Sequence, residues 1–314
     1  MTPQTQYPSD APPRRASRLV HYLVAALLSG GCFSLKDYAL DKLYGLSAAG
    51  IESFAREDDP ELVRLAMPVT LKAMEAVLLR DPENAAVLTA AAGAFAQYSY
   101  AFVLSDAQKL EETDYRAFLI GQERALRLFL RARDYGLRGL EVSHPGISEA
   151  LILDPEGAVM ALSEEDVEAA YWCASAWGLA ISAGRDRPEL LADIDAVRAL
   201  LRRSLSLDED YGEGSLHVAM IIIEGLPPMM GGSPERARGH FASAIELSGE
   251  GIAGPYLTLA ENVSLPAQDR EEFIRLLRIT LDMDLDARPQ SRLANRLAQM
   301  RARELMEKLD DLFL

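Results

Sequence analysis

The sequence has few of the residues on which metal-binding and disulfide-stapled proteins depend. It holds two cysteines and four histidines among its 314 residues, and two cysteines are too few for a disulfide framework. No histidine has a second ligand type at helical spacing, and HExxH or paired CxxC patterns do not occur. These gaps argue against a zinc site. We therefore expect neither a metal nor any other cofactor.

The motifs of nucleophilic and nucleotide chemistry are also missing. The sequence contains no GxSxG, P-loop or GxGxxG pattern, which argues against the enzyme classes built on them. In "GEGSLH", Ser215 stands two residues before His217, but a catalytic pair also needs an orienting acid and an oxyanion hole. We expect no catalytic residue, and an envelope hydrolase is the least favoured function class. His217 is interpreted as a core residue or as one that lines a pocket.

Positive charge is scarce relative to negative charge. The chain has 32 lysines and arginines against 48 aspartates and glutamates, a net charge of −16. Such a chain repels phosphate backbones, so we expect no nucleic-acid partner. Hydrophobic residues make up 49% of the sequence, which is ordinary for a soluble globular protein and ample for a core.

One apolar run near the N-terminus, "LVHYLVAALL" (residues 19–28), is too short to cross a bilayer. A spanning helix needs about twenty residues. The run follows a basic segment that ends in three arginines, and it precedes the small residues Ser29–Gly31 and then Cys32. A basic region, a short apolar region and small residues before a cleavage site are typical of a secretory signal. We expect no membrane-spanning helix after Leu28.

Small residues directly before Cys32 resemble the lipobox of bacterial lipoproteins. In that pattern the cysteine is acylated and the signal is cut before it; here Ser29 replaces the usual leucine three residues upstream. Two or three acyl chains would hold the protein durably, at about 0.8 kcal/mol per buried CH₂. We predict a signal peptide at 1–31 and a mature domain at 32–314, in the periplasm and anchored only through Cys32, with the outer membrane favoured over the inner. The alternatives are a cleaved signal with an incidental cysteine and a cytosolic protein with an apolar N-terminal helix.

The rest of the chain has the periodicity of helices. Apolar stripes with a 3.6-residue period occur at Phe273, Leu276, Leu277 and Leu281, and at Ile194, Val197, Leu201 and Leu205. No segment alternates with period two, so the pattern predicts an all-α protein. Ser163 with Asp166, and Ser233 with Pro234, are typical helix starts.

The predicted helices form pairs separated by acidic or Gly/Pro turns. The pairs are 67–80 with 85–103, 194–207 with 215–224, 234–248 with 256–263, and 269–283 with 290–313. Turns at Asp208, Ser248 and Asp284 are 40 and 36 residues apart, close to the period of about 34 in tetratricopeptide repeats. We predict degenerate tetratricopeptide-like helical hairpins in a single superhelical domain. Such arrays offer concave faces that bind peptides, proteins or ligands.

The stretch from Leu104 to Leu162 fits this pairing less well. Prolines and glycines interrupt it, yet it carries large apolar residues: Ile147, Leu151, Ile152, Leu153 and Met160. A loop this apolar is expected to pack, either over a cavity or as a plain insertion against the core.

Aromatic residues gather in "AAYWCASAWG", which contains both tryptophans of the chain, Trp172 and Trp177, beside Tyr171. Their spacing does not place the three on one helical stripe. One interpretation is that they pack helices together. The other is that one tryptophan lines a pocket for an apolar ligand. Cys173, in the same segment, is interpreted as a small buried hydrophobe.

Four longer segments resemble the TatT family, the T-components associated with tripartite ATP-independent periplasmic (TRAP) transporters. They are "DVEAAYWCASAWGLAIS", "GEGSLHVAMI", "GGSPERARGHFASAIELSGEGIAGPYLTLAENVSLPAQDREEFIRLL" and "RLANRLAQMRARELMEKLDDLFL". The resemblance runs from about Ser34 to Leu314.

The resemblance implies an all-α periplasmic lipoprotein with cryptic tetratricopeptide-like repeats, which forms a homotrimer and has a pore in each protomer. It also implies association with the periplasmic solute-binding P-component, whose ligands are hydrophobic molecules or organic acids. The leading hypothesis is therefore an accessory T-component of a TRAP uptake system, with Tyr171, Trp172, Trp177 and His217 as pocket candidates. The alternative is a tetratricopeptide-type interaction scaffold of the cell envelope without a small ligand.

Overall fold

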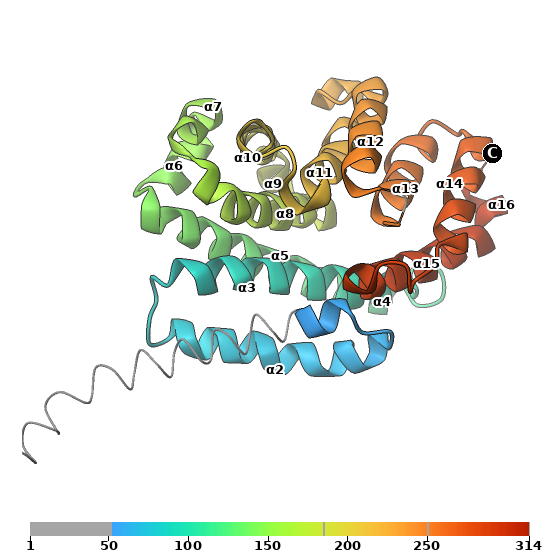
Figure 1. The fold of residues 1–314 in the computed structure, drawn as a ribbon, viewed down its shortest axis with the longest axis horizontal. Helices are drawn as coiled ribbons and strands as arrows, with labels where there is room; N and C mark the ends of the chain where they lie inside the picture. Colours follow the sequence, from blue (N-terminus) through green and yellow to red (C-terminus); the bar gives the residue numbers. More distant parts are fainter. Residues whose placement is uncertain (1–51, 185, 250, 314) are drawn as a thin grey trace, which may run out of the picture. The chain divides into compact units, whose positions relative to one another are not determined.

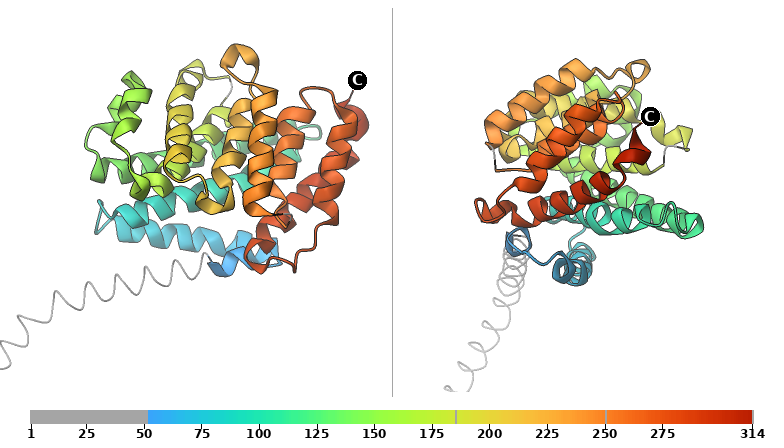
Figure 2. Two further views of the ribbon diagram at one scale, coloured as in Figure 1. Left: turned by 45° about the horizontal axis from the view of Figure 1, so that its top comes forward. Right: turned by 90° about the vertical axis from the view of Figure 1, so that its right-hand side faces the viewer.

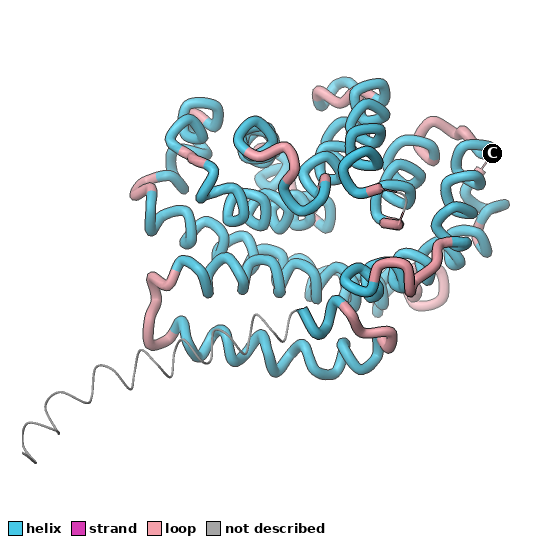
Figure 3. The backbone as a smooth tube through the Cα atoms, viewed as in Figure 1, coloured by secondary structure: helices cyan, strands magenta, loops and turns pink. Residues whose placement is uncertain are grey.

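The computed structural model describes residues 52–184, 186–249 and 251–313. Within these ranges the chain forms helices joined by turns and loops, and no strand occurs (Figure 3). This confirms the all-α prediction. The predicted signal peptide, Ser29 and Cys32 lie outside the described residues.

The first helices begin where the sequence offers caps. Helix α2 spans Pro60–Leu78 behind Asp59, whose side chain accepts hydrogen bonds from two backbone N–H groups. After the "DPEN" turn, α3 spans Ala85–Tyr98, capped by the side chain of Asn84. It continues as a π-helical segment and a last short turn: η1 (Ser99–Leu104) and α4 (Ser105–Gln108).

The helical run Ala85–Gln108 is, by length and composition, apolar enough to span a membrane. Our expectation that no such run follows Leu28 missed it. The run carries no charged residue before Asp106. In the structure 61% of its apolar window is buried inside the protein. The run is therefore packed as a core helix of the fold.

The region from Leu104 to Leu162 is mostly helical, so the prediction of a loop there was wrong, although some of its apolar residues do pack as predicted. It contains α5, Tyr115–Ser143, the longest helix among the described residues, followed by three short helices: α6 (Ile147–Leu153), α7 (Pro155–Ala158) and η2 (Val159–Ala161). Pro145, Gly146, Pro155 and Gly157 all lie after α5, whereas the glycines at 121, 136 and 139 lie inside it. Ile147 and Leu151 are buried, whereas Leu153 is largely exposed.

The aromatic segment forms a buried helix. The capping box of Ser163 and Asp166 is present at η3 (Glu164–Asp166), and α8 follows at Val167–Ala183, with α9 at Pro188–Leu191. Helix α8 packs closely on α5, and both pack on α3. A Cβ atom on Gly136 would lie 2.7 Å from the Cys173 Cα atom, so this crossing needs a glycine.

The C-terminal helices follow the predicted pairs closely. The predicted ranges 194–207, 215–224 and 234–248 are α10 (Ile194–Leu207), α11 (Ser215–Glu224) and α12 (Pro234–Ser248). The remaining elements are α13 (Gly254–Leu259), η6 (Ala260–Ser264), α14 (Arg270–Asp282), η7 (Pro289–Ser291), α15 (Arg292–Glu307) and α16 (Leu309–Leu312), with short 3₁₀ turns η4 (Tyr211–Glu213) and η5 (Pro228–Met230). Ser233 caps α12 as predicted.

Successive helices pack on one another, as α10 does on α11, α11 on α12 and α14 on α15 (Figure 1). Figure 2 shows α2 on the outside of this series, against α3. Helix α15 also contacts α2, so the last long helix returns to the first. This packing is compatible with helical hairpins, while tetratricopeptide-like repeats and a superhelix stay predictions.

Candidate functional site

Trp177, one of the predicted pocket residues, lies in the core of the α5–α8–α10 region. Its side chain is 1% exposed. The indole N–H donates a hydrogen bond to Asp193 Oδ2 at 3.1 Å, and the Arg133 guanidinium lies over the ring at 5.5 Å. The indole N–H, the only hydrogen-bonding group of the side chain, is therefore paired inside the protein. Trp177 presents no free surface to a ligand in this conformation.

Tyr171 and Trp172 are only partly buried and form an aromatic pair. Their ring centroids lie 4.8 Å apart, and Tyr211 extends the group, 5.2 Å from Tyr171. Burial raises the pKa of Tyr171, although the nearby Ser175 and Ser215 hydroxyls act in the opposite direction. The pair therefore provides a neutral, largely apolar wall whose polar groups are the Tyr171 hydroxyl and the Trp172 indole N–H.

His217 is 3% exposed and belongs to a polar group between α11 and α12. Its Nδ1 atom lies 2.9 Å from Nδ1 of His240, and its Nε2 atom lies 3.3 Å from the Glu209 carboxylate without a well-directed hydrogen bond. Ser215 does not bond His217; it donates to the Gly212 carbonyl at 2.7 Å. The Ser–His spacing in the sequence thus produces no nucleophilic pair.

The Trp172 indole packs against α3 at Gly93. A Cβ atom on Gly93 would lie 2.8 Å from Trp172 Cε2, so only glycine lets the indole sit there. Gln97 and Tyr100 follow Gly93 by four and seven residues, the spacing of one helical face. Both are exposed to solvent. We call Gly93, Gln97 and Tyr100 the α3 face.

A charged group borders the other end of the α3 face. Arg301 on α15 donates a hydrogen bond from Nε to Glu261 Oε1 at 2.8 Å. The Glu261 carboxylate and burial raise the pKa of Tyr100, although half of the Tyr100 residue surface is exposed (50%). Tyr100 thus lies close to this ion pair while remaining accessible. The α3 face therefore runs from an aromatic wall to an arginine, a distance of about 10 Å along the helix at 1.5 Å per residue.

Two of these residues lie on π-helical segments, Tyr100 on η1 and Glu261 on η6. A π-turn inserts one extra residue into a helix and is found frequently at functional sites. Sequence reasoning did not find Tyr100, Glu261 or Arg301, because they come from distant helices and carry no motif. It did find Tyr171 and Trp172, which the structure places together, and it grouped Trp177 and His217 with them although both are buried elsewhere in the core.

The comparison with known proteins decides the family. The sequence matches the family of the TRAP transporter T-component (TAtT) over residues 56–313. The chain belongs to this family. A protein of Treponema pallidum (strain Nichols), described only as uncharacterized, is 28% identical over 266 residues, which cover 83% of this chain and 82% of the relative.

Membership in the T-component family makes the protein an envelope-associated accessory of TRAP transport. The family is a family of transport accessories and not a family of enzymes. Among residues 52–184, 186–249 and 251–313, no three His, Cys, Asp or Glu side chains are grouped so as to hold a metal ion.

Proposed function

We propose that the protein is a lipid-anchored, periplasmic T-component that docks the solute-binding P-component of a TRAP transporter and holds an apolar or organic-acid ligand. The observation that carries the proposal is the family match, which covers nearly the whole chain after residue 55. Cys32 supplies the anchor in this proposal, and the protein acts as a homotrimer of tetratricopeptide-like protomers. No bond is made or broken.

The ligand part of the proposal rests on the α3 face. A partly exposed aromatic pair, Tyr171 and Trp172, stands at one end, and the Glu261–Arg301 ion pair at the other. Ligand sites typically combine an apolar wall with few, well-placed polar groups. An apolar chain would lie along the aromatic wall and its polar end would reach the Glu261–Arg301 pair. Trp177 and His217 would meet such a ligand only after the core repacks, since both are buried.

Co-purification tests the docking step. The tagged full chain is recovered from envelopes solubilised in mild detergent, beside an unrelated lipoprotein that carries the same tag. We expect a periplasmic solute-binding protein to be recovered with the first and not with the second. The docking role would be contradicted if no solute-binding protein is recovered with the full chain. It would also be contradicted if the same proteins are recovered with the full chain and with the unrelated lipoprotein. A partner of another kind would favour the envelope scaffold.

The two tryptophans provide matched reporters for the ligand. The Trp177→Phe variant leaves Trp172 as the single fluorophore at the α3 face, whereas Trp172→Phe leaves only the buried Trp177. Titration with sodium decanoate should change the emission of Trp172 alone. No change in either variant would remove the ligand from the proposal and leave docking in place, which favours the scaffold alternative. Equal changes in both variants would indicate a global rearrangement.

A further inference from the structure

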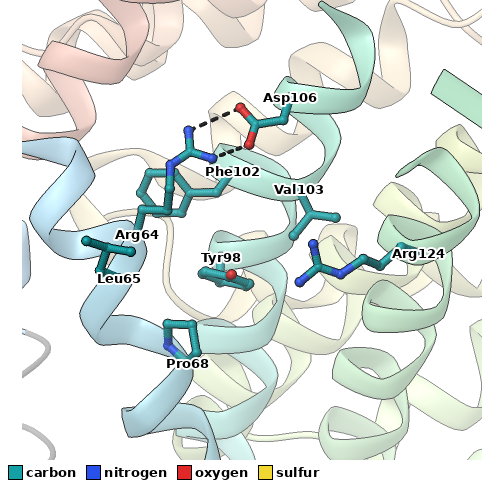
Figure 4. Close-up of a pocket in the computed structure, with 8 residues that line it drawn as sticks. All are labelled: Arg64, Leu65, Pro68, Tyr98, Phe102, Val103, Asp106 and Arg124. Atoms are coloured by element: carbon teal, nitrogen blue, oxygen red, sulfur yellow. Dashed lines mark hydrogen bonds and ion pairs between the residues drawn. The ribbon is translucent and has the colours of Figure 1, made fainter. Parts of the chain in front are cut away.

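A pocket of about 270 Å³ lies on the other side of the α3–η1 run, between α2 and α5 (Figure 4). Its apolar lining comes from Leu65, Pro68, Tyr98, Phe102 and Val103, and its charged lining from Arg64, Asp106 and Arg124. Tyr98 and Phe102 are four residues apart and share a face of the helix, which is opposite to Tyr100. The pocket is therefore separate from the α3 face.

Local backbone chemistry explains why the helices leave room here. Pro68 lies inside α2; it has no N–H to donate to the Arg64 carbonyl one turn earlier, and its ring pushes the neighbouring backbone away. On the opposite wall, Phe102 and Val103 belong to the π-helical segment η1, which is wider than an α-helix. Neither irregularity can pack as closely as two regular helices would.

One of the two arginines in the pocket is already neutralised. Arg64 Nη2 donates to Asp106 Oδ1 at 3.1 Å, and Nη1 donates to the other carboxylate oxygen. The guanidinium also lies over the Phe102 ring at 5.1 Å. Hydrogen bonding to Asp106 raises the pKa of Arg64. This pair is bidentate, and it leaves Arg64 little capacity for a second anion.

Arg124, by contrast, has no hydrogen bond or ion pair to any residue in the described part of the chain. It comes from α5, and Figure 4 shows its guanidinium directed to the space between Tyr98 and Val103. The Tyr98 hydroxyl likewise makes no hydrogen bond to a described residue. The charges of Arg64 and Asp106 cancel, so the residues that line the pocket carry one net positive charge, that of Arg124, beside an apolar and aromatic wall.

We propose that this pocket binds a small carboxylate with an apolar body, whose acid group pairs with Arg124 and whose body lies against Pro68, Val103 and the Tyr98 ring. A planar carboxylate matches the paired N–H donors of a guanidinium. The volume is near the lower end of ligand pockets, about 300 to 1,000 Å³, so the body has the size of an aromatic ring or a short alkyl chain. The proposal does not rest on the transport role.

Three probes of one shape test the charge preference. Phenylacetate, 2-phenylethanol and 2-phenylethylammonium are titrated into the purified full chain, and binding is followed by ligand-observed NMR. The carboxylate should bind, and the alcohol should bind about tenfold more weakly because it forms no charge-assisted hydrogen bond. The ammonium should not bind. Equal affinity of phenylacetate and 2-phenylethanol would overturn the proposal.

Two arginines on α5 provide a matched pair of variants. Arg124→Gln should weaken phenylacetate binding about tenfold. Arg127 is exposed like Arg124 but lies outside the pocket lining, so Arg127→Gln removes the same charge and should leave the affinity unchanged. Asp106→Asn removes the negative charge from the pocket lining, although Arg64 keeps its ion pair with Glu61 at 2.8 Å, and should strengthen binding. Equal effects of the two arginine variants would overturn the proposal, and so would weaker binding in a folded Asp106→Asn protein. Neither result would bear on docking of a solute-binding protein.

Discussion

In the histidine pair between α11 and α12, the surroundings of His240 favour its uncharged form. His217 and His240 share a 2.9 Å contact between their Nδ1 atoms, which requires one nitrogen to donate and the other to accept. Burial and the proximity of His217 lower the pKa of His240, and Arg236 and Arg202 act in the same direction against the Glu224 carboxylate. Two protonated rings at this distance would repel one another.

This pair predicts acid sensitivity of the fold. Because the folded-state pKa of His240 is lowered, unfolded chains bind the proton more readily. The pair's contribution to stability is present above the ordinary pKa of 6.5 and is lost as the pH falls through the lower folded-state value. The free energy of unfolding, measured by urea titration, should therefore fall between about pH 7.5 and about pH 5.5.

A variant separates this effect from the general effect of acid. His240→Asn keeps a hydrogen-bonding side chain without a titrating ring, so the loss of stability toward low pH should be smaller. The comparison variant is His144→Asn, which removes a histidine whose Nε2 atom lies 2.9 Å from Asp166. If His240→Asn and the unmodified protein lose the same free energy, the pair is not the cause.

At the scale of elements, close helix crossings depend on small residues. A Cβ atom on Gly136 of α5 would approach the Cys173 Cα atom of α8 to 2.7 Å. Cys173 itself is buried, as predicted, and burial raises its thiol pKa to about 12. Gly136 and Cys173 thus set the distance between α5 and α8, the helix that carries the aromatic pair.

Replacing two different helical glycines by alanine should change the free energy of unfolding in opposite directions. Gly136→Ala forces α5 and α8 apart and should destabilise the protein by about 1–3 kcal/mol, the usual range for overpacking. Gly239 in α12 has open space around its missing Cβ atom, so Gly239→Ala should stabilise by about 0.5–1 kcal/mol through helix propensity. Urea unfolding measures both; a stabilising Gly136→Ala would refute the close crossing.

At the scale of the whole described part, the two ends of the helix series are in contact. Lys109, after α4, lies 3.2 Å from Glu304 of α15, and Lys308 donates to Glu112 at 2.6 Å. A simple stack of repeats contacts only its neighbours. The return of α15 to the first helices therefore adds long-range contacts that hairpin pairing alone would not predict.

Membrane attachment should depend on one residue. When cells are labelled with a clickable fatty acid, the unmodified protein should carry the label and sediment with membranes, because two or three acyl chains bind durably. Cys32→Ala should lose both the label and the sedimentation, since the mature chain is otherwise acidic and charged. Equal labelling of the two proteins would refute the anchor. The second cysteine, Cys173, is buried and serves as the internal control.

The proposed homotrimer predicts a mass in solution of about three chains, each of 34.4 kDa with its signal. Light scattering on the purified protein over a range of concentrations measures it directly. Because stable interfaces hold at low concentration, the mass should not fall on moderate dilution. A mass of one chain throughout would remove the trimer from the proposal and leave the docking and ligand parts to their own tests.

Features that depend on neighbours along the chain were predicted well. The bounds of α10, α11 and α12 agree with the predicted ranges, because the caps, turns and apolar stripes that define them lie within a few residues of each end. The long helix α5 was missed. Pro145, Gly146, Pro155 and Gly157 lie beyond its end, and they give the whole region from Leu104 to Leu162 the composition of a loop.

The sequence by itself determined the all-helical class, the bounds of α10, α11 and α12, the family and the aromatic pair Tyr171 and Trp172, since each depends on residues close together in the chain. Only the tertiary structure decided which of those aromatics stay accessible: Trp177 is buried with Asp193, while Trp172 rests on Gly93. It also brought Tyr100 to Glu261 and left Arg124 without a partner in a pocket. Such groupings depend on how distant helices pack, and no spacing along the chain encodes that.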